Sequence, residues 1–174
     1  MPRQTPKPLD AAGLMSYAAR TLAARPQTVS EMRTKLRRRA ARREDAEEVL
    51  ARLKEAGYLN DKRLAESLAN WRRENEGLGK TRVIRDLMAR RVAPSLAKQA
   101  AEAAYRDADE PAMIQKFLER KYRGKNLAAI LAQEKHLAAA YRKLRLAGFS
   151  SGNSVRALKR YAAEADRLEE LEDT

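Results

Sequence analysis

The amino-acid sequence predicts an all-α fold, an elongated array of three tandem three-helix repeats of helix-turn-helix type. Val, Ile and Thr total only 14 of the 174 residues, so few side chains favour strands. Ala contributes 33 residues and is the best helix former. Apolar residues recur at spacings of three and four, which is the period of one helix face. Each repeat is too short to bury its apolar faces alone, so neighbouring repeats are expected to stack.

The N-terminal part of the chain divides into an arm and two short helices. Three prolines within residues 1–12 favour a flexible N-terminal arm. A first helix is expected from near Leu14 to Ala24, because the ring of Pro26 clashes with a continuing turn. Thr28 and Glu31 have the spacing of a capping box, in which each side chain bonds the other residue's backbone N–H. Thr28 therefore starts the second helix.

A third helix ends at Gly57 and completes the first repeat, residues 13–57. The second repeat, residues 58–107, begins with a helix capped by Asn60 or Asp61. One face of that helix carries large apolar residues, which we expect to be buried: Leu64, Leu68 and Trp71. A turn with two glycines and two further helices follow.

An internal repeat is visible when the sequence is displaced against itself. A displacement of 51 residues sets Leu36 on Leu87, and a displacement of 57 sets Leu87 on Leu144. The third repeat is expected over residues 108–167 and carries extra residues before Leu144. Residues 125–147 form either one long helix or a helix broken near residues 133–136. Residues 168–174 are expected to be an acidic, frayed tail.

The composition excludes several classes of function. The chain has no Cys and a single His, which rules out thiol chemistry, disulfides and multi-His zinc ligation. No pair of carboxylates implies a convergent pocket, so we expect no catalytic residue, no metal and no cofactor. The longest apolar run is far too short to cross a membrane, and no signal-type segment begins the chain. We expect a cytoplasmic protein that does not bind membranes.

The charge balance points to a polyanionic partner. Lys and Arg number 37 against 24 Asp and Glu, a formal net charge of +13. Seven cations lie within eleven residues from position 33, with no acid among them, and a weaker group begins at position 80. The candidate binding residues are Arg33, Lys35, Arg37, Arg38, Arg39, Arg42, Arg43, Lys80, Arg82, Arg85, Arg90 and Arg91.

Two other features have simpler interpretations. The stretch GLGKT, residues 77–81, ends like a phosphate-binding loop, but Glu74 stands where that loop needs its first glycine. A helix-to-helix turn explains these glycines better. His136 has charged neighbours and no second ligand of its kind, which indicates an exposed side chain rather than a metal site.

Four stretches of the chain resemble the RecX family of recombination regulators. They are AARTLAARPQTVSEMRTKL (residues 18–36), GYLNDKRLAESLANWRRE (57–74), GLGKTRVIRDLMARRV (77–92) and, more weakly, LRLAGFSSGNSVRAL (144–158). The middle stretch is the most specific. The chain departs from the usual family pattern at Asn60, at Leu64 and at Lys80 or Thr81, which affects helix capping and core filling but no catalytic group.

The resemblance implies a non-enzymatic protein that modulates the RecA recombinase, mainly by inhibition, in homologous recombination, DNA repair and the SOS response. Such a protein lies in the groove of the RecA filament on single-stranded DNA. There it blocks filament growth, ATP hydrolysis, strand exchange and co-protease activity. The partners are then the RecA filament and single-stranded DNA, with double-stranded DNA as a further partner, and the protein is expected to be a monomer.

Two alternatives remain open at this point. The runner-up is a sequence-specific helix-turn-helix DNA-binding protein, because a basic helix of a three-helix unit can enter the major groove. The Ala-rich third helix of the second repeat offers Lys98 and Gln99 but few other side chains to read bases. The second alternative is a nuclease, but the chain lacks the clustered carboxylates that a catalytic metal needs.

Overall fold

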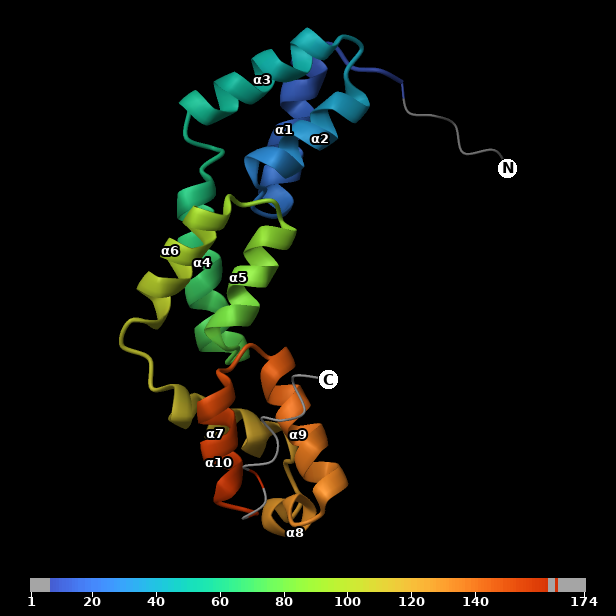
Figure 1. Cartoon of the computed structure of the whole chain (residues 1–174). Helices are drawn as coiled ribbons and strands as arrows, with labels where there is room; N and C mark the ends of the chain where they lie inside the picture. Colours follow the sequence, from blue (N-terminus) through green and yellow to red (C-terminus); the bar gives the residue numbers. More distant parts are fainter. Residues whose placement is uncertain (1–6, 163–164, 166–174) are drawn as a thin grey trace, which may run out of the picture. The chain divides into compact units, whose positions relative to one another are not determined.

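The computed structural model describes residues 7–162 and Ala165, and for these residues the all-α prediction is confirmed. The predicted acidic tail lies outside them. In the described residues no strand occurs, and the elements (Figure 1) are α1 (Ala11–Ala24), α2 (Val29–Arg39), α3 (Arg43–Glu55), α4 (Asp61–Trp71), the π-helix η1 (Arg72–Glu76), α5 (Lys80–Ala89), α6 (Pro94–Tyr105), α7 (Glu110–Lys121), α8 (Leu127–Leu131), α9 (Glu134–Leu146) and α10 (Ser151–Lys159).

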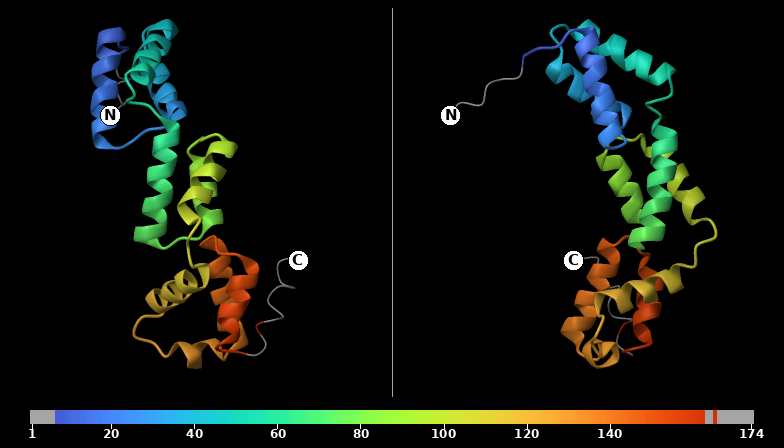
Figure 2. Two further views of the ribbon diagram at one scale, coloured as in Figure 1. Left: turned by 90° about the vertical axis from the view of Figure 1, so that its left-hand side faces the viewer. Right: turned by 180° about the vertical axis from the view of Figure 1, so that it is seen from behind.

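The chain divides into two compact units. Unit 1 consists of Met1–Ser67 with Leu87–Ala97, and unit 2 consists of Leu68–Asp86 with Lys98–Thr174. Helices α1, α2 and α3 belong to unit 1 and lie side by side (Figure 2). Helices α7 to α10 belong to unit 2, and each unit holds part of α4, α5 and α6.

The core of unit 1 forms between α1, α2 and α3, around Leu14, Met32 and Leu36, which are fully buried. The predicted capping box of α2 is present. The backbone N–H of Glu31 donates to the Thr28 hydroxyl at 3.0 Å, and the backbone N–H of Thr28 donates to the Glu31 carboxylate at 2.9 Å. The boundaries of α2 follow from this local chemistry.

Helix α1 begins at Ala11, within the segment for which the sequence predicts a flexible arm. Asp10 caps it, accepting from the backbone N–H of Gly13 at 2.8 Å. Leu9 makes two backbone hydrogen bonds next to the end of α2. Its N–H donates to the carbonyl of Arg39 at 2.7 Å, and its carbonyl accepts from the N–H of Ala41 at 2.8 Å. These bonds tie residues 9 and 10 to the first three helices.

In unit 1, the start of α2 also meets the end of α5. The Thr28 hydroxyl donates to the carbonyl of Arg90 at 3.0 Å. The sequence predicted either Asn60 or Asp61 as the N-cap of α4. In the structure Asn60 is the cap, and its side chain accepts from the N–H of Arg63 at 2.9 Å. The Asp61 side chain instead accepts from the backbone N–H of Val29 at 2.8 Å, and this bond joins α4 to α2.

The buried face of α4 differs from the prediction. Ala65 and Ala69 are fully buried, Leu64 and Leu68 are only half-buried, and Trp71 is 50% exposed. The expectation that Trp71 packs in the core is therefore wrong. After Trp71 the backbone continues as the π-helix η1, which ends at Gly77 with φ +60°, a left-handed conformation that glycine adopts freely.

The core of unit 2 forms between α7, α9 and α10. Phe117 and Phe149 meet edge to face, with ring centroids 5.6 Å apart. The stretch before Leu144 is broken into α8 and α9 at Ala132 and Gln133, which resolves the alternative that the sequence left open. Helix α10 ends at Lys159.

Unit 2 contains a backbone contact that corresponds to the Thr28–Arg90 contact of unit 1. The N–H of Gly79 donates to the carbonyl of Ala147 at 2.8 Å. Gly79 follows Thr28 by the 51-residue displacement, and Ala147 follows Arg90 by the 57-residue displacement. In both places the start of a helix in one repeat, α2 or α5, bonds the end of the equivalent helix in the next repeat, α5 or α9. The displacements found in the sequence therefore describe equivalent structural positions.

Candidate functional site

The first basic group lies on α2, at the α2–α3 turn and at the start of α3. Met32 and Leu36 point into the core, so the side chains of Arg33 and Arg37, one turn apart, lie on the outer surface of α2. Both are paired with Glu47 of α3. The Arg33–Glu47 ion pair spans 3.5 Å, and the Arg37–Glu47 ion pair spans 2.7 Å. The cluster has no acid in its own sequence, but the neighbouring helix supplies one.

A second ion pair lies at the α2–α3 turn. The guanidinium of Arg42 donates to both carboxylate oxygens of Asp45, at 2.7 and 3.2 Å, and Asp45 is buried. Hydrogen bonding to Asp45 raises the pKa of Arg42. This fork-like contact fixes Arg42 beside the N-terminus of α3.

The other cations of this group differ in what surrounds them. The Arg39 guanidinium lies over the ring of Tyr17, 5.6 Å from its centroid, and its buried Nε has no hydrogen-bond partner. Lys35 is half-buried, whereas Arg38 and Arg43 are exposed. Within the described part of the chain these last three have no ion-pair partner. Arg38 and Arg43 therefore carry the uncompensated charge that faces solvent.

The second basic group divides between the two units. In unit 2, Lys80 lies 3.8 Å from Glu102, and Arg82 pairs with Asp86 at 2.9 Å. Arg82 and Arg85 both donate to the carbonyl of Leu146, at 3.4 and 3.1 Å, where α9 ends. Cations at the C-terminal end of a helix bind its free carbonyls and complement its dipole. These two arginines thus hold α5 and α9 together.

In unit 1, Arg90 is engaged inside the fold. It donates to both carboxylate oxygens of Glu31, at 3.0 and 2.7 Å, and to the carbonyl of Pro26 at 2.8 Å. The hydrogen bond to Glu31 raises the pKa of Arg90. Partial burial opposes ionisation of Glu31, but bonds from Arg90 and the Thr28 backbone outweigh it and lower the Glu31 pKa. Arg91 is exposed.

The GLGKT turn is not built to bind phosphate. A phosphate loop presents free backbone N–H groups at the start of a helix. Here the N–H groups of Gly79 and Thr81 already donate to the carbonyls of Ala147 and Gly148, at 2.8 and 3.2 Å. The hydroxyl of Tyr105 bonds the carbonyl of Leu78 at 2.5 Å, and burial raises the Tyr105 pKa to about 12. The turn therefore connects helices, as the sequence interpretation favoured.

The described residues contain no group of three or more His, Cys, Asp or Glu placed to hold a metal ion. His136 is exposed, as expected. Two aspartates have structural contacts: Asp45 binds Arg42, and Asp109 caps α7 by accepting from Ala112 N–H at 2.9 Å. Over the described part of the chain, no helix is long and apolar enough to span a membrane.

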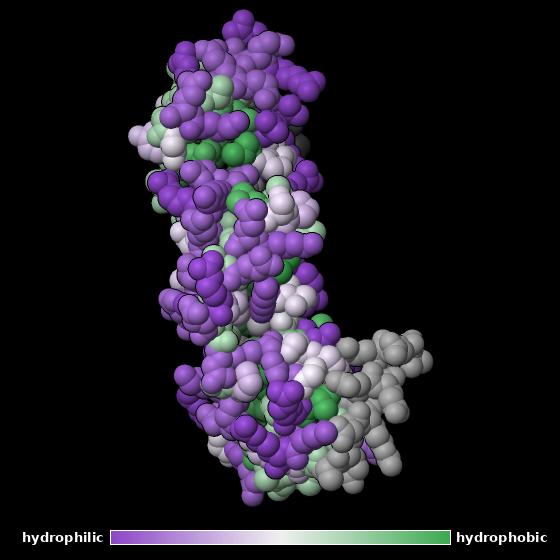
Figure 3. Space-filling model, turned by 60° about the vertical axis from the view of Figure 1, so that its left-hand side comes forward, coloured by the Kyte–Doolittle hydropathy of each residue, from purple (hydrophilic) through white to green (hydrophobic). Residues whose placement is uncertain are grey.

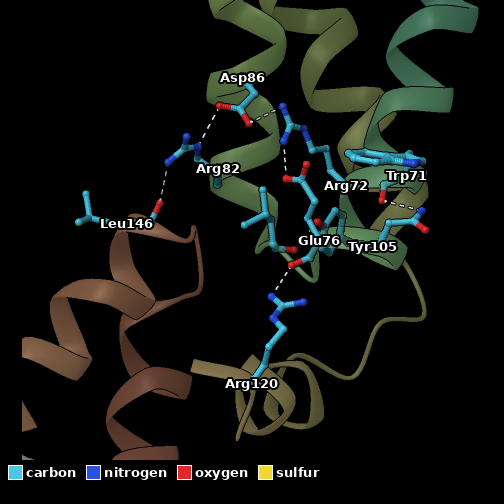
Figure 4. A network of polar contacts seen from close by, with 10 residues as sticks. Trp71, Arg72, Glu76, Arg82, Asp86, Tyr105, Arg120 and Leu146 are labelled. Carbon is cyan, nitrogen blue, oxygen red and sulfur yellow. Dashed lines mark hydrogen bonds and ion pairs between the residues drawn. The ribbon is translucent and has the colours of Figure 1, made fainter. Parts of the chain in front are cut away.

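Sequence reasoning missed a polar network in unit 2 that has Trp71 at its edge (Figure 4). Arg72 pairs with Glu76 and lies 3.7 Å from Asp86. Arg120 of α7 donates to the backbone carbonyl of Glu76 at 2.5 Å. The ion pair between Arg72 and Glu76 has the helical i,i+4 spacing, which the sequence does show. The contact of Arg72 with Asp86 and the contact of Arg120 with Glu76 join distant segments and have no local signal.

The matches to family profiles cover the first two repeats. Residues 15–53 match the first three-helix domain of RecX, and residues 60–100 match its second three-helix domain. Both ranges lie within the repeats expected from the sequence.

Three similar proteins are each named regulatory protein RecX. That of Trichlorobacter lovleyi is 34% identical over 107 residues, which are 62% of this chain and 70% of that protein. That of Deinococcus radiodurans is 41% identical over 97 residues, 56% of this chain and 45% of that protein. That of Amycolatopsis mediterranei is 35% identical over 89 residues, 51% of each chain. The latter two are matched over about half of their length.

Two solved structures share the fold. RecX from Lactobacillus salivarius gives a TM-score of 0.66 at 18% identity and is covered over 96% of its chain, by 87% of this one. A second crystal structure of regulatory protein RecX gives a TM-score of 0.68 at 19% identity, covering 86% of this chain and 73% of that one. At these identities the likeness concerns the fold alone.

Proposed function

The chain belongs to the RecX family, and from that premise we propose that it is a non-enzymatic regulator of the RecA recombinase, mainly an inhibitor. In this proposal it binds as a monomer in the groove of the RecA–DNA filament in the cytoplasm. Bound there, it blocks filament growth, ATP hydrolysis, strand exchange and co-protease activity. Contacts to several protomers raise its avidity without any new chemistry.

One observation carries the proposal beyond the family: the basic surface of α2 and α3 presents Arg38 and Arg43 to solvent without an acidic partner in the described residues. Uncompensated cations on a chain with a net charge of +13 attract acidic protein surfaces and phosphates. Figure 3 shows hydrophilic side chains over much of one face of the molecule. Such a surface suits binding rather than catalysis.

Six of the other candidate cations fall into two classes. Arg82, Arg85 and Arg90 bind carbonyls or carboxylates inside their unit, so we assign them first to the fold. Arg33 and Arg37 are paired at the surface with Glu47, where exchange for a stronger anion is inexpensive. Arg42 binds the buried Asp45, so we assign it to the fold as well. We therefore rank Arg38 and Arg43 first as contacts and the surface-paired arginines second.

The test is DNA-dependent ATP hydrolysis by RecA from the same organism, measured on single-stranded DNA at physiological salt while this protein is titrated. Inhibition at substoichiometric amounts is expected, because a bound regulator that stops growth affects many protomers. No effect at excess protein would contradict the proposal and would favour a helix-turn-helix DNA-binding protein. Competition with unrelated duplex DNA then tests sequence discrimination, which a regulator bound mainly by charge lacks.

A further inference from the structure

Trp71 is a large aromatic side chain that the fold leaves at the surface. It is the only tryptophan of the chain and is 50% exposed, at the end of α4. The same helix buries Ala65 and Ala69 completely. A half-exposed indole keeps apolar area in water, so its position forgoes about half of the gain that full burial would give. Tryptophan is enriched among the residues that carry most of the binding energy at interfaces.

The structure holds the ring in place from one side. The Arg72 guanidinium lies over the indole, 5.7 Å from the ring centroid. Arg72 is itself fixed by Glu76 and by Asp86, whose carboxylate also accepts from Arg82 at 2.9 Å. Figure 4 shows Trp71 at the edge of this network.

The backbone around the ring is also specialised. Trp71 is the last residue of α4 before the π-helix η1, and its carbonyl accepts from the Asn75 side chain at 3.2 Å. Within η1, Arg73 donates to Glu74 at 2.6 Å and to the carbonyl of Ala104 in α6. Short π-helical turns of this kind occur frequently at functional sites. The ring is thus presented by a turn that is fixed on both sides.

The charges identify the class of ligand. Arg72, Arg73 and Arg82 are paired with carboxylates, so attraction at this point comes from the ring face rather than from a free cation. Unit 2 nevertheless holds 20 Lys and Arg against 15 Asp and Glu in its sequence, a net charge of +5. That field draws a polyanion to the unit. A flexible polyanion that also offers flat π faces is a single-stranded nucleic acid.

We propose that Trp71 is a stacking site for an unpaired nucleobase of single-stranded nucleic acid, with Arg72 as the residue that positions the ring. A duplex is a poor ligand because its bases are stacked on one another and hide their faces. The inference rests on the proposed function only in that single-stranded DNA is a partner there. It adds the element that contacts the bases.

The sole tryptophan makes the contact directly observable. We expect a short oligothymidylate to quench the fluorescence of Trp71, because a stacked base lies against the indole. A duplex of the same length and an abasic oligomer with the same number of phosphates bind through charge but leave the fluorescence unchanged. Binding of each ligand is followed separately by the anisotropy of a dye on its end. Equal quenching by the abasic oligomer would overturn the proposal.

Substitution measures what the ring contributes. Trp71→Leu keeps an apolar side chain but removes the stacking face, and we expect about 5- to 100-fold weaker binding of the oligothymidylate. Trp71→Phe retains a smaller ring and should recover part of the affinity. Tyr58→Leu is the matched control, because Tyr58 of unit 1 is an exposed aromatic, 68% accessible, outside the proposed site. Unchanged circular dichroism establishes that each variant is folded.

Three outcomes separate this inference from its alternatives. Wild-type affinity in Trp71→Leu overturns it. Loss of RecA inhibition in Trp71→Leu, with oligothymidylate binding unchanged, assigns Trp71 to a protein contact and also overturns it. Quenching and the affinity loss in a protein that does not inhibit RecA would contradict the proposed function and leave the stacking site standing.

Discussion

The backbone of Gly79 lies directly against the backbone of Gly148 in unit 2. A β-carbon at position 79 would fall 2.2 Å from the carbonyl carbon of Gly148. Gly148 has φ +92°, a conformation that side chains rarely adopt, and its own β-carbon would meet the Arg82 backbone at 2.2 Å. Two glycines therefore permit the contact through which the start of α5 bonds the end of α9.

Gly79→Ala is expected to destabilise the protein by at least about 1–3 kcal/mol, because the atoms in the way are backbone and cannot rotate aside. The measurement is the midpoint of denaturant unfolding. Gly152→Ala is the matched control within a helix: its β-carbon meets nothing within 4 Å, so a gain of about 0.5–1 kcal/mol is expected. Equal stability of the two variants would contradict the close contact.

The Thr28 hydroxyl makes a second testable contact, at the equivalent place in unit 1. It accepts from the N–H of Glu31 and donates to the carbonyl of Arg90, each at 3.0 Å, and Thr28 is fully buried. Thr28→Val keeps the shape and loses both bonds, so a loss of about 2 kcal/mol is expected. Thr28→Ser keeps the hydroxyl and should retain most of the stability. If Thr28→Ser were as unstable as Thr28→Val, the loss would be due to packing rather than to the hydrogen bonds.

The Glu31–Arg90 pair predicts a dependence of stability on pH. The pKa of Glu31 is lower in the folded protein than its ordinary value of 4.5, so the pair stabilises the fold above that pH. The contribution is lost as pH falls through the folded-state pKa. Glu31→Gln, which resembles the protonated acid, should cost about 1–3 kcal/mol near neutral pH and almost nothing in acid. Thermal unfolding of both proteins across pH shows whether the gap closes; a constant gap would contradict the ionic interpretation.

Features encoded by near neighbours in the chain could be predicted from the sequence. The capping box needs only Thr28 and Glu31, three residues apart, and it is present. The stop at Pro26 and the buried stripe of Met32 and Leu36 follow from proline sterics and helical periodicity in the same way. The repeat displacements were also readable, because they compare the sequence with itself.

Features set by a partner element could not be predicted in this way. The buried face of α4 was predicted from the spacing of its large apolar residues, but the helix buries Ala65 and Ala69 and leaves Trp71 half-exposed. The basic cluster contains no acid, yet Glu47 of the following helix pairs with Arg33 and Arg37. Arg90 was a candidate for binding, and its partner Glu31 lies 59 residues earlier in the chain. Each outcome depends on which helices meet, which periodicity does not specify.

Arg38 and Arg43 are expected to make the main contacts of the basic surface with its partner. Arg38→Gln together with Arg43→Gln removes two charges that have no acidic partner in the described residues, so inhibition of RecA ATP hydrolysis should weaken clearly. If both residues contact phosphates of single-stranded DNA, the slope of log K against log salt should fall by about 1.4. Arg20→Gln together with Lys54→Gln is the matched control, because these exposed cations lie in the same unit outside the cluster and the net charge changes equally. A control pair that loses as much inhibition would show that overall charge, rather than the α2–α3 surface, determines binding.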